Sequence, residues 1–439
     1  MHTTAIQAGF GRACITPKGF VHLAGGDAAK RRTDTVLDDL YITCVALQEG
    51  GQTVLIYTMD VVAAEDSFTQ PARLAVSAAT GIAPENILLN ATHVHSAVSI
   101  RSEWDGVEAY RELFNEAAAK AGVDAIADLA DAGIAYGDTP TEGLAFVRHY
   151  ALDNGTFAGP NFGNFKSGNI IGHAEKADTL CQIVRFARKD KKDILMMNFP
   201  AHATLKGRTI DLWISADFPG TTRQYVEEQT GTLAAYFIAG GGNQVPSSRI
   251  EGEAVSNSDH QLYGQTLGKY VVDALPGLTQ IDATGLKLKT KTYIGSANKE
   301  DLDKLPMAET VIAAGREFGN VSKEAVAVAK ANGFSSYFAA TAVVTRSRLP
   351  ETIPMDLRTL RIGNLGFVFA PYEMFGTSAM TLREKSPCQA TFIVTCSQGA
   401  KGYMPDRRGF ELGCYESCVT RFARGTAEAL VDEFVAMLK

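Results

Sequence analysis

The chain has 439 residues, of which 46% are hydrophobic and 21% charged, and this composition excludes a disordered or fibrous protein. A net charge of -7, with the basic residues scattered along the chain, argues against a nucleic-acid partner and favours a small-molecule substrate. No apolar run approaches the roughly 18 residues that span a bilayer, and the first residues lack the apolar core of a signal peptide, so we expect a cytoplasmic protein without an integral membrane segment.

The first predicted elements are two strands joined by a turn. Residues 41–47 and 53–57 are rich in apolar and β-branched side chains, and Gly50 and Gly51 lie between them. This pattern predicts a β-hairpin that enters a sheet. Further short apolar runs bounded by turn residues are predicted to be strands at Ile87–Asn90, Leu180–Phe186, Ile194–Phe199, Ala234–Ile238 and Gly366–Phe369.

Helical periodicity occurs between these strands. The predicted helices are Ala109–Leu129, Pro219–Glu228, His260–Leu275, an interrupted stretch at Leu302–Ala331, and Val419–Leu438. Strands that alternate with helices, together with the hairpin, predict an α/β fold with mixed β-sheet layers flanked by helices. We expect one domain over residues 1–439, with a helical insertion around residues 298–332 that could cover or border a pocket.

Seven cysteines are scattered through the chain without a C-x-x-C motif. This spacing predicts neither a disulfide framework nor a zinc site made of thiolates. Cys414 and Cys418 lie on either side of Tyr415 and could line a site, although packing is the expected role of buried cysteines.

A His-x-His pair follows the predicted strand at Ile87–Asn90. If the strand continues through His93 and His95, their side chains point to the same face and can reach one point. Loops at strand ends are where α/β proteins gather their sites, and histidine is the commonest metal ligand. The pair therefore indicates a metal or catalytic site.

Two other strand ends carry candidate residues. His202 follows the strand at Ile194–Phe199, and a third histidine favours a three-point zinc site. Asp217 could cap the next helix or orient a histidine. Glu373 follows the strand at Gly366–Phe369, and it could be a metal ligand, a general base or an acidic residue in the first turn of a helix.

These segments, in this order, resemble the N-terminal catalytic domain of the neutral/alkaline (non-lysosomal) ceramidase family. The similarity runs from Gly9 to the end of the chain, and five motifs in the same order make it fairly specific. The five motifs are Gly9–Thr16, Ala91–Ser96, Phe199–Thr204, Pro371–Glu373, and Gly402-Tyr403 followed by Tyr415–Thr420, and the strand ending at Asp60 also matches.

The resemblance implies a set of metal ligands. Carried over by position, it implies Zn²⁺ bound by His93, His202, Glu373 and Tyr403, with His95 beside the metal as a group that faces the substrate or handles a proton. A metal at this point would favour the tyrosine phenolate over the neutral phenol.

The resemblance also implies catalytic residues and shows one departure. Arg148 matches an arginine of the family, and Tyr415 matches a tyrosine that faces the substrate carbonyl. Val245 stands where the family has a functional serine, so a serine nucleophile would have to come from Ser247 or Ser248. We also expect a chain without the Ig-like C-terminal domain and the secretion signal of those enzymes.

The sequence therefore predicts a zinc-dependent hydrolase that cleaves the amide bond of an N-acyl compound with a metal-activated water, a ceramidase-like amidase of lipid metabolism. His95 could take or return a proton, and Arg148 and Tyr415 could donate hydrogen bonds to the developing oxyanion. The alternatives are a zinc hydrolase of a small polar or sugar-derived amide or ester, a catalytically inactive binding homologue and, ranked lower because the strand–helix units do not number eight, a TIM-barrel amidohydrolase. The oligomeric state stays open.

Overall fold

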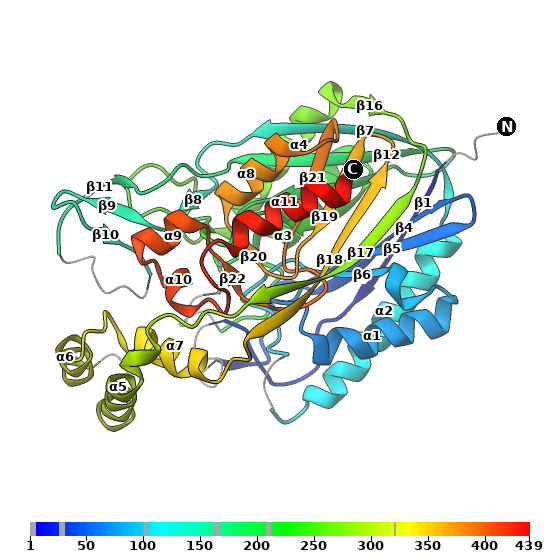
Figure 1. Ribbon diagram of the computed structural model, residues 1–439. Helices are drawn as coiled ribbons and strands as arrows, with labels where there is room; N and C mark the ends of the chain where they lie inside the picture. Colours follow the sequence, from blue (N-terminus) through cyan, green and yellow to red (C-terminus); the bar gives the residue numbers. More distant parts are fainter. Residues whose placement is uncertain (1–5, 26–30, 101–103, 161–166, 208–211, 320–321) are drawn as a thin grey trace.

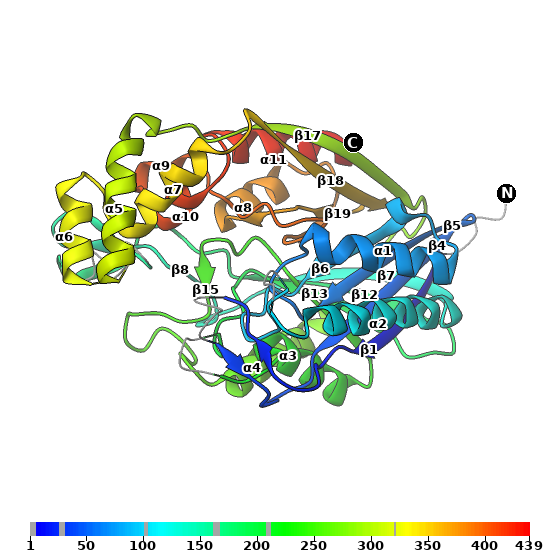
Figure 2. The ribbon, with the colours of Figure 1, turned by 90° about the horizontal axis from the view of Figure 1, so that it is seen from below.

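Two β-sheets face each other, and helices cover the outer face of each (Figures 1 and 2). This computed structural model describes residues 6–25, 31–100, 104–160, 167–207, 212–319 and 322–439. The expected α/β fold with mixed sheets flanked by helices is confirmed.

The larger sheet contains nine strands. The predicted hairpin is present, because β4 and β5 pair antiparallel around Gly50 and Gly51. β1 and β7 share only two residue pairs, so this junction joins two halves of the sheet. In order across the sheet the strands are β14 (Leu233–Ile238), β13 (Ile194–Phe199), β12 (Leu180–Arg188), β7 (Ala130–Pro140), β1 (Gln7–Cys14), β4 (Tyr41–Glu49), β5 (Gln52–Met59) and β6 (Ile87–Ala91), with β16 (Thr279–Ile281) beside β7.

Four helices cover the outer face of this sheet: α1 (Asp66–Thr80), α2 (Val107–Ala127), α3 (Asp217–Thr230) and α4 (His260–Ala274). The last three confirm the predicted helices to within two residues at each end. The sequence prediction missed α1, which has Pro71 inside it. Proline removes a backbone donor and usually ends a helix, so a helix was not predicted here despite the apolar face of α1.

The smaller sheet has the order β17 (Lys287–Ser296), β18 (Thr352–Ile362), β19 (Leu365–Phe369) and β21 (Ala390–Val394), and α8 (Gly376–Lys385) and α11 (Thr426–Leu438) cover it. The predicted C-terminal helix is wrong at its start, because residues 415–419 form a separate short helix, α10 (Tyr415–Val419). Thr420 is extended, and Gly425 has a φ of 90°, which interrupts the helical geometry between the two.

A third group of helices lies at one end of the molecule (Figure 1). Between β17 and β18 the chain forms α5 (Leu305–Phe318), α6 (Lys323–Ala331) and α7 (Tyr337–Ser347). The helical segment thus extends past the expected residues 298–332, of which 320–321 lie outside the described residues. α7 contacts α10, which places this group beside the C-terminal part of the chain.

Apolar side chains from both sheets form a common core. Phe237 of β14 and Phe392 of β21 meet edge to face, with ring centroids 5.9 Å apart. Since strands buried on both faces need apolar residues at successive positions, β5, β6, β13, β19 and β21 are continuous apolar runs rather than alternating ones.

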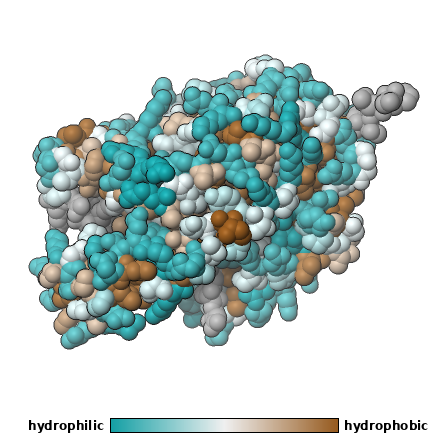
Figure 3. Space-filling view, viewed as in Figure 1, coloured by the Kyte–Doolittle hydropathy of each residue, from teal (hydrophilic) through white to brown (hydrophobic). Residues whose placement is uncertain are grey.

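The visible surface is mostly hydrophilic, with small brown apolar areas scattered over it (Figure 3). Among the described residues, no helix combines the length and apolar character required to cross a bilayer.

Candidate metal centre

Loops from both sheets meet where four strands end: β6 and β13 of the larger sheet, and β19 and β21 of the smaller one. Val94 and Ala203 form a parallel bridge between the first two loops, and the amide of His95 donates to the carbonyl of Ala203. Asn90 at the end of β6 bridges Ser397 beyond β21. The crossing loops therefore hold side chains from distant parts of the sequence at one point.

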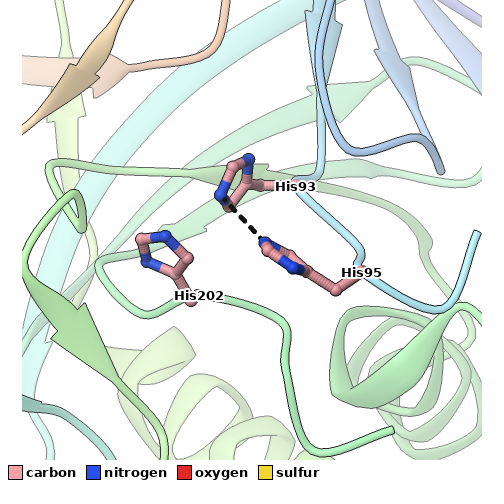
Figure 4. Close-up of side chains that lie close together, drawn as sticks. All are labelled: His93, His95 and His202. Atoms are coloured by element: carbon pink, nitrogen blue, oxygen red, sulfur yellow. Dashed lines mark hydrogen bonds between the residues drawn. The ribbon is translucent and has the colours of Figure 1, made fainter. Parts of the chain in front are cut away.

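Three histidines lie together at this point (Figure 4). The Nε2 atoms of His93 and His95 are 3.3 Å apart, and the ring centroids of His93 and His202 are 4.5 Å apart. One ring nitrogen from each of the three lies within 4.8 Å of the others. His93 and His202 are buried and His95 is half-buried, so the cluster faces the solvent mainly through His95.

The structure corrects the reason why the first two histidines converge. β6 ends at Ala91, so His93 and His95 are not successive same-face positions of a strand. His93 instead has a φ of 63°, a left-handed conformation that is uncommon for a residue with a side chain. A turn, rather than the period of a strand, brings the two rings together.

Backbone carbonyls fix the orientation of two histidine rings. Nδ1 of His93 lies 2.6 Å from the carbonyl oxygen of Val62, and Nδ1 of His202 lies 2.8 Å from that of Gly241. Since a carbonyl oxygen only accepts hydrogen bonds, this network assigns the ring proton to Nδ1 in both residues. Each Nε2 then presents a bare lone pair to the cluster, as in a histidine that binds a metal.

Glu373 completes a set of facing acceptors. Its Oε2 atom lies 3.4 Å from Nε2 of His93 and 3.2 Å from Nε2 of His202. Within the described part of the chain, neither Glu373 Oε2 nor His202 Nε2 has a hydrogen-bond partner of normal geometry, although both atoms are buried. Buried acceptors that face one another fit a bound cation, and nitrogen and carboxylate ligands fit zinc.

Tyr403 lies beside this set. Short strands β20 (Glu373–Met374) and β22 (Tyr403–Met404) run parallel, with Glu373 and Tyr403 as direct partners. The Tyr403 ring stacks near His202, at a centroid distance of 6.3 Å. Burial and the nearby Glu373 hold the pKa of the Tyr403 phenol well above its ordinary value, and a cation at the site would act in the opposite sense.

Three buried charged or polar side chains, Arg148, Glu416 and His149, form a connected chain that contacts the Tyr403 ring. The guanidinium of Arg148 lies over the Tyr403 ring, 5.3 Å from its centroid, and Nε donates to Glu416 Oε1 at 2.5 Å. The other oxygen of Glu416 lies 2.9 Å from Nε2 of His149. Burial raises the pKa of the Glu416 carboxyl, but Arg148 and His149 outweigh it and hold that pKa well below its ordinary value.

Glu416 and His149 are two residues of this site that were not predicted from the sequence. The available signal was the position of each next to a candidate residue, since Glu416 follows Tyr415 and His149 follows Arg148. With Cys414, which precedes Tyr415, they form a second buried cluster of groups able to bind a metal, but Glu416 already pairs with Arg148 through one oxygen and His149 through the other.

A cavity of about 480 Å³ opens at the histidines. Among the described residues, the proposed catalytic groups His95 and Tyr415 line it, while Arg148 does not and lies against Tyr403 instead. The lining consists of Ala24, Gly25, Val62, Ala63, His93, His95, Ser99, Ile100, Glu373, Ala400, Lys401, Gly402, Tyr403, Tyr415, Val419 and Arg421.

The two serines that follow Val245 are not among these lining residues. Val245 lies in β15 (Gln244–Val245), which pairs with β8 (Phe146–Val147). The hydroxyl of Ser248 donates to Glu253 at 2.7 Å. The geometry of the described residues therefore gives no support to Ser247 or Ser248 as a displaced nucleophile.

Among the described residues, the Asp217 carboxylate accepts hydrogen bonds from backbone amides and not from a histidine. Its Oδ2 accepts from the amide of Lys206 at 2.8 Å, and its Oδ1 accepts from the amide of Phe218. Asp217 is the first residue of α3, and the residue at the N-cap position is Ala216. The carboxylate thus binds the loop after His202 to the start of α3.

Comparison with known proteins gives a fold relationship. No protein-family model matches the chain, and no curated protein matches it in sequence. The solved structure described as neutral ceramidase from Pseudomonas aeruginosa is similar with a TM-score of 0.73 and 17% identity, over 99% of this chain and 74% of that one. A structure described as ceramidase complexed with C2 is similar with a TM-score of 0.72 and 15% identity, over 99% and 75%. At these identities the likeness shows a shared fold.

Proposed function

We propose that this chain is a zinc-dependent hydrolase that cleaves the amide bond of an N-acyl compound, with the whole chain as one catalytic domain. The observation that supports it best is that Nε2 of His202 and Oε2 of Glu373 are buried without a hydrogen-bond partner and lie near Nε2 of His93. His93 and Glu373 line the cavity next to this point. The chain shares its fold with two structures described as ceramidases, and a ceramidase is an enzyme that hydrolyses an amide bond. The reaction adds water across the C–N bond and releases a carboxylic acid and an amine.

The ligands proposed for zinc are His93, His202, Glu373 and Tyr403. The two histidines present Nε2 lone pairs, Glu373 presents Oε2, and Tyr403 is the direct strand partner of Glu373. When bound, zinc would supply a Lewis acid that polarises a carbonyl and lowers the pKa of a water. The Nδ1 hydrogen bonds to backbone carbonyls keep both histidine rings turned toward this point.

The other residues are assigned to substrate and protons. His95 lines the cavity and can take a proton from the attacking water and return it to the leaving amine. Tyr415, 5.9 Å from Tyr403 between ring centroids, can donate its hydroxyl proton in a hydrogen bond to the developing oxyanion. Arg148 holds the Tyr403 ring, and Glu416 holds Arg148, so that pair positions the phenol.

The test compares metal content with turnover. Purified protein should contain one equivalent of zinc by elemental analysis and should hydrolyse N-octanoyl amides until a chelator removes the metal. His93→Ala and His202→Ala should lose both zinc and activity, whereas His95→Ala should keep zinc and lose activity. His260→Gln is the matched control, because His260 pairs with Asp38 and is absent from the histidine cluster.

Two outcomes would contradict the proposal. If the folded protein takes up no zinc, the proposed metal site is excluded. If hydrolysis persists after chelation, the proposed role of the metal in the reaction is excluded. If His95→Ala lost zinc as well, His95 would have to be counted as a ligand.

A catalytically inactive binding homologue is the second candidate, and Val245 in the serine position favours it. Stoichiometric zinc without turnover of neutral or charged amides would support this candidate. Zinc-dependent turnover by the wild-type chain would exclude it.

A further inference from the structure

Two basic side chains line the cavity close to the proposed metal centre. Lys401 lies two residues before Tyr403, and Arg421 lies two residues after the end of α10, which begins at Tyr415. Two residues of the histidine cluster, His93 and His95, and two cationic side chains therefore line the same cavity. Its volume of about 480 Å³ lies in the range of roughly 300–1,000 Å³ typical of small-molecule sites.

Among the described lining residues the charge balance is positive, although the whole chain carries -7. Among the described lining residues the only acidic one is Glu373, which faces His93 and His202. Arg421 forms no ion pair within the described part of the chain. Lys401 pairs with Asp66 at 3.6 Å, and the Asp66 side chain is 55% exposed, so solvent weakens that pair.

The backbone near Arg421 is fixed from two sides. The hydroxyl of Thr420 donates to the carbonyl of Tyr403 at 2.9 Å, and the carbonyl of Arg421 accepts from the amide of Asn298 at 2.7 Å. The backbone position of Arg421 relative to Tyr403 is thus set by the fold, and its exposed side chain lines the cavity from that position. A cationic side chain that lines the cavity of a reactive centre can select an anionic substrate.

Resting on the proposed function, we infer that the substrate is an anionic amide, an N-acyl compound with a carboxylate or phosphate group that pairs with Arg421 and Lys401. The guanidinium fork fits the two oxygens of either group, and the lysine adds a point charge. An N-acyl amino acid is the simplest member of this class. A neutral N-acyl lipid would offer no anion to Arg421 and would leave Lys401 with only its solvent-exposed pair to Asp66.

The experiment uses matched pairs of amides on the zinc-loaded protein. N-octanoylglycine is compared with neutral N-octanoylglycinamide, and N-octanoyl-phosphoethanolamine with neutral N-octanoylethanolamine. We expect kcat/KM to favour at least one anionic member by tenfold or more, and added salt to reduce that preference. The pair with the larger ratio distinguishes a carboxylate from a phosphate substrate.

Variants then assign the preference to the two side chains. Arg421→Gln should lower kcat/KM for the anionic amide by about tenfold to a hundredfold, as expected for loss of a charged hydrogen bond, and should lower that for the neutral amide by less than about threefold. Lys401→Gln should act in the same sense and more weakly. Arg424→Gln is the matched control, because Arg424 lies near Glu300 and is not among the lining residues.

Binding measurements separate this inference from the proposed function. If calorimetric titration shows that the anionic amides bind more tightly than the neutral ones and Arg421→Gln abolishes the difference, the inference stands even without turnover, and only the hydrolase assignment fails. If neutral and anionic amides bind and react equally well, or if Arg421→Gln weakens both equally, the inference is overturned while hydrolysis remains.

Discussion

At the scale of single residues, the Glu416 carboxylate holds two basic side chains at once. It is fully buried and accepts from Arg148 and His149. Glu416→Gln would leave Arg148 buried beside a neutral group, so the free energy of unfolding should fall by roughly 3 kcal/mol or more. Denaturation in urea measures the change, with the exposed pair Lys269–Asp273 as the reference.

The reference variant, Asp273→Asn, removes a solvent-exposed pair and should change the free energy of unfolding far less than Glu416→Gln does. Equal losses in Glu416→Gln and Asp273→Asn would show that the buried charge chain contributes no more than a surface pair. If Glu416→Gln folds with zinc bound, kcat should fall by a larger factor than KM changes, because Arg148 contacts and positions Tyr403.

At the scale of elements, Asp128 joins α2 to the larger sheet. It follows the last residue of α2 and accepts from the amide of Phe10 in β1 and from the side chains of Arg188 and Lys191. A carboxylate at a helix C-terminus is unfavourable, and the two cations offset this. Burial raises the pKa of Asp128, but Arg188 and Lys191 outweigh it and the pKa is lowered.

Because the folded state lowers this pKa, the ionised carboxylate stabilises the fold above the unfolded pKa of about 3.9, and the contribution is lost as pH falls through the folded value. Because solvent screens these partly exposed ion pairs, Asp128→Asn should lower the free energy of unfolding by about 1 kcal/mol at pH 7, and progressively less below pH 4. Guanidinium denaturation at pH 7 and pH 3 measures both values. A difference that is unchanged at pH 3 would contradict this assignment.

A close approach between two loops fixes the position of Glu373. A Cβ atom on Gly242 would lie 2.5 Å from the carbonyl oxygen of Glu373. Gly242→Ala should push β20 away from the histidines and weaken zinc binding by about tenfold to a hundredfold, as changes around metal ligands do. Competition with a zinc chelator measures the affinity, and Gly277→Ala, where the added Cβ meets no atom within 4 Å, should leave it unchanged.

At the scale of the whole molecule, the proposed ligands come from both sheets. His93 and His202 follow strands of the larger sheet, and Glu373 and Tyr403 follow strands of the smaller one. Zinc bound to the folded state alone should raise the free energy of unfolding by about 4 kcal/mol when free zinc exceeds Kd a thousandfold. Calorimetry with and without zinc measures this, and His202→Ala should remove the difference.

The sequence by itself determined the elements with strong local patterns. The hairpin of β4 and β5, and helices α2, α3 and α4, were predictable because apolar periodicity and turn residues act over a few positions. The resemblance of the motifs also selected His93, His202 and Glu373, which the structure brings together. α1 and the start of α11 were missed or misplaced, since Pro71 and Gly425 alter the local signal.

Only the tertiary structure decided how the site is built. The left-handed turn at His93, the carbonyl partners of the histidine rings and the pairing of Glu416 with Arg148 join residues up to 268 positions apart. No local pattern encodes such contacts, because they arise when the ends of four strands pack against one another. The candidate ligands could be predicted from the sequence, whereas the orientation of their side chains and the positions of Lys401 and Arg421 at the cavity came from the fold.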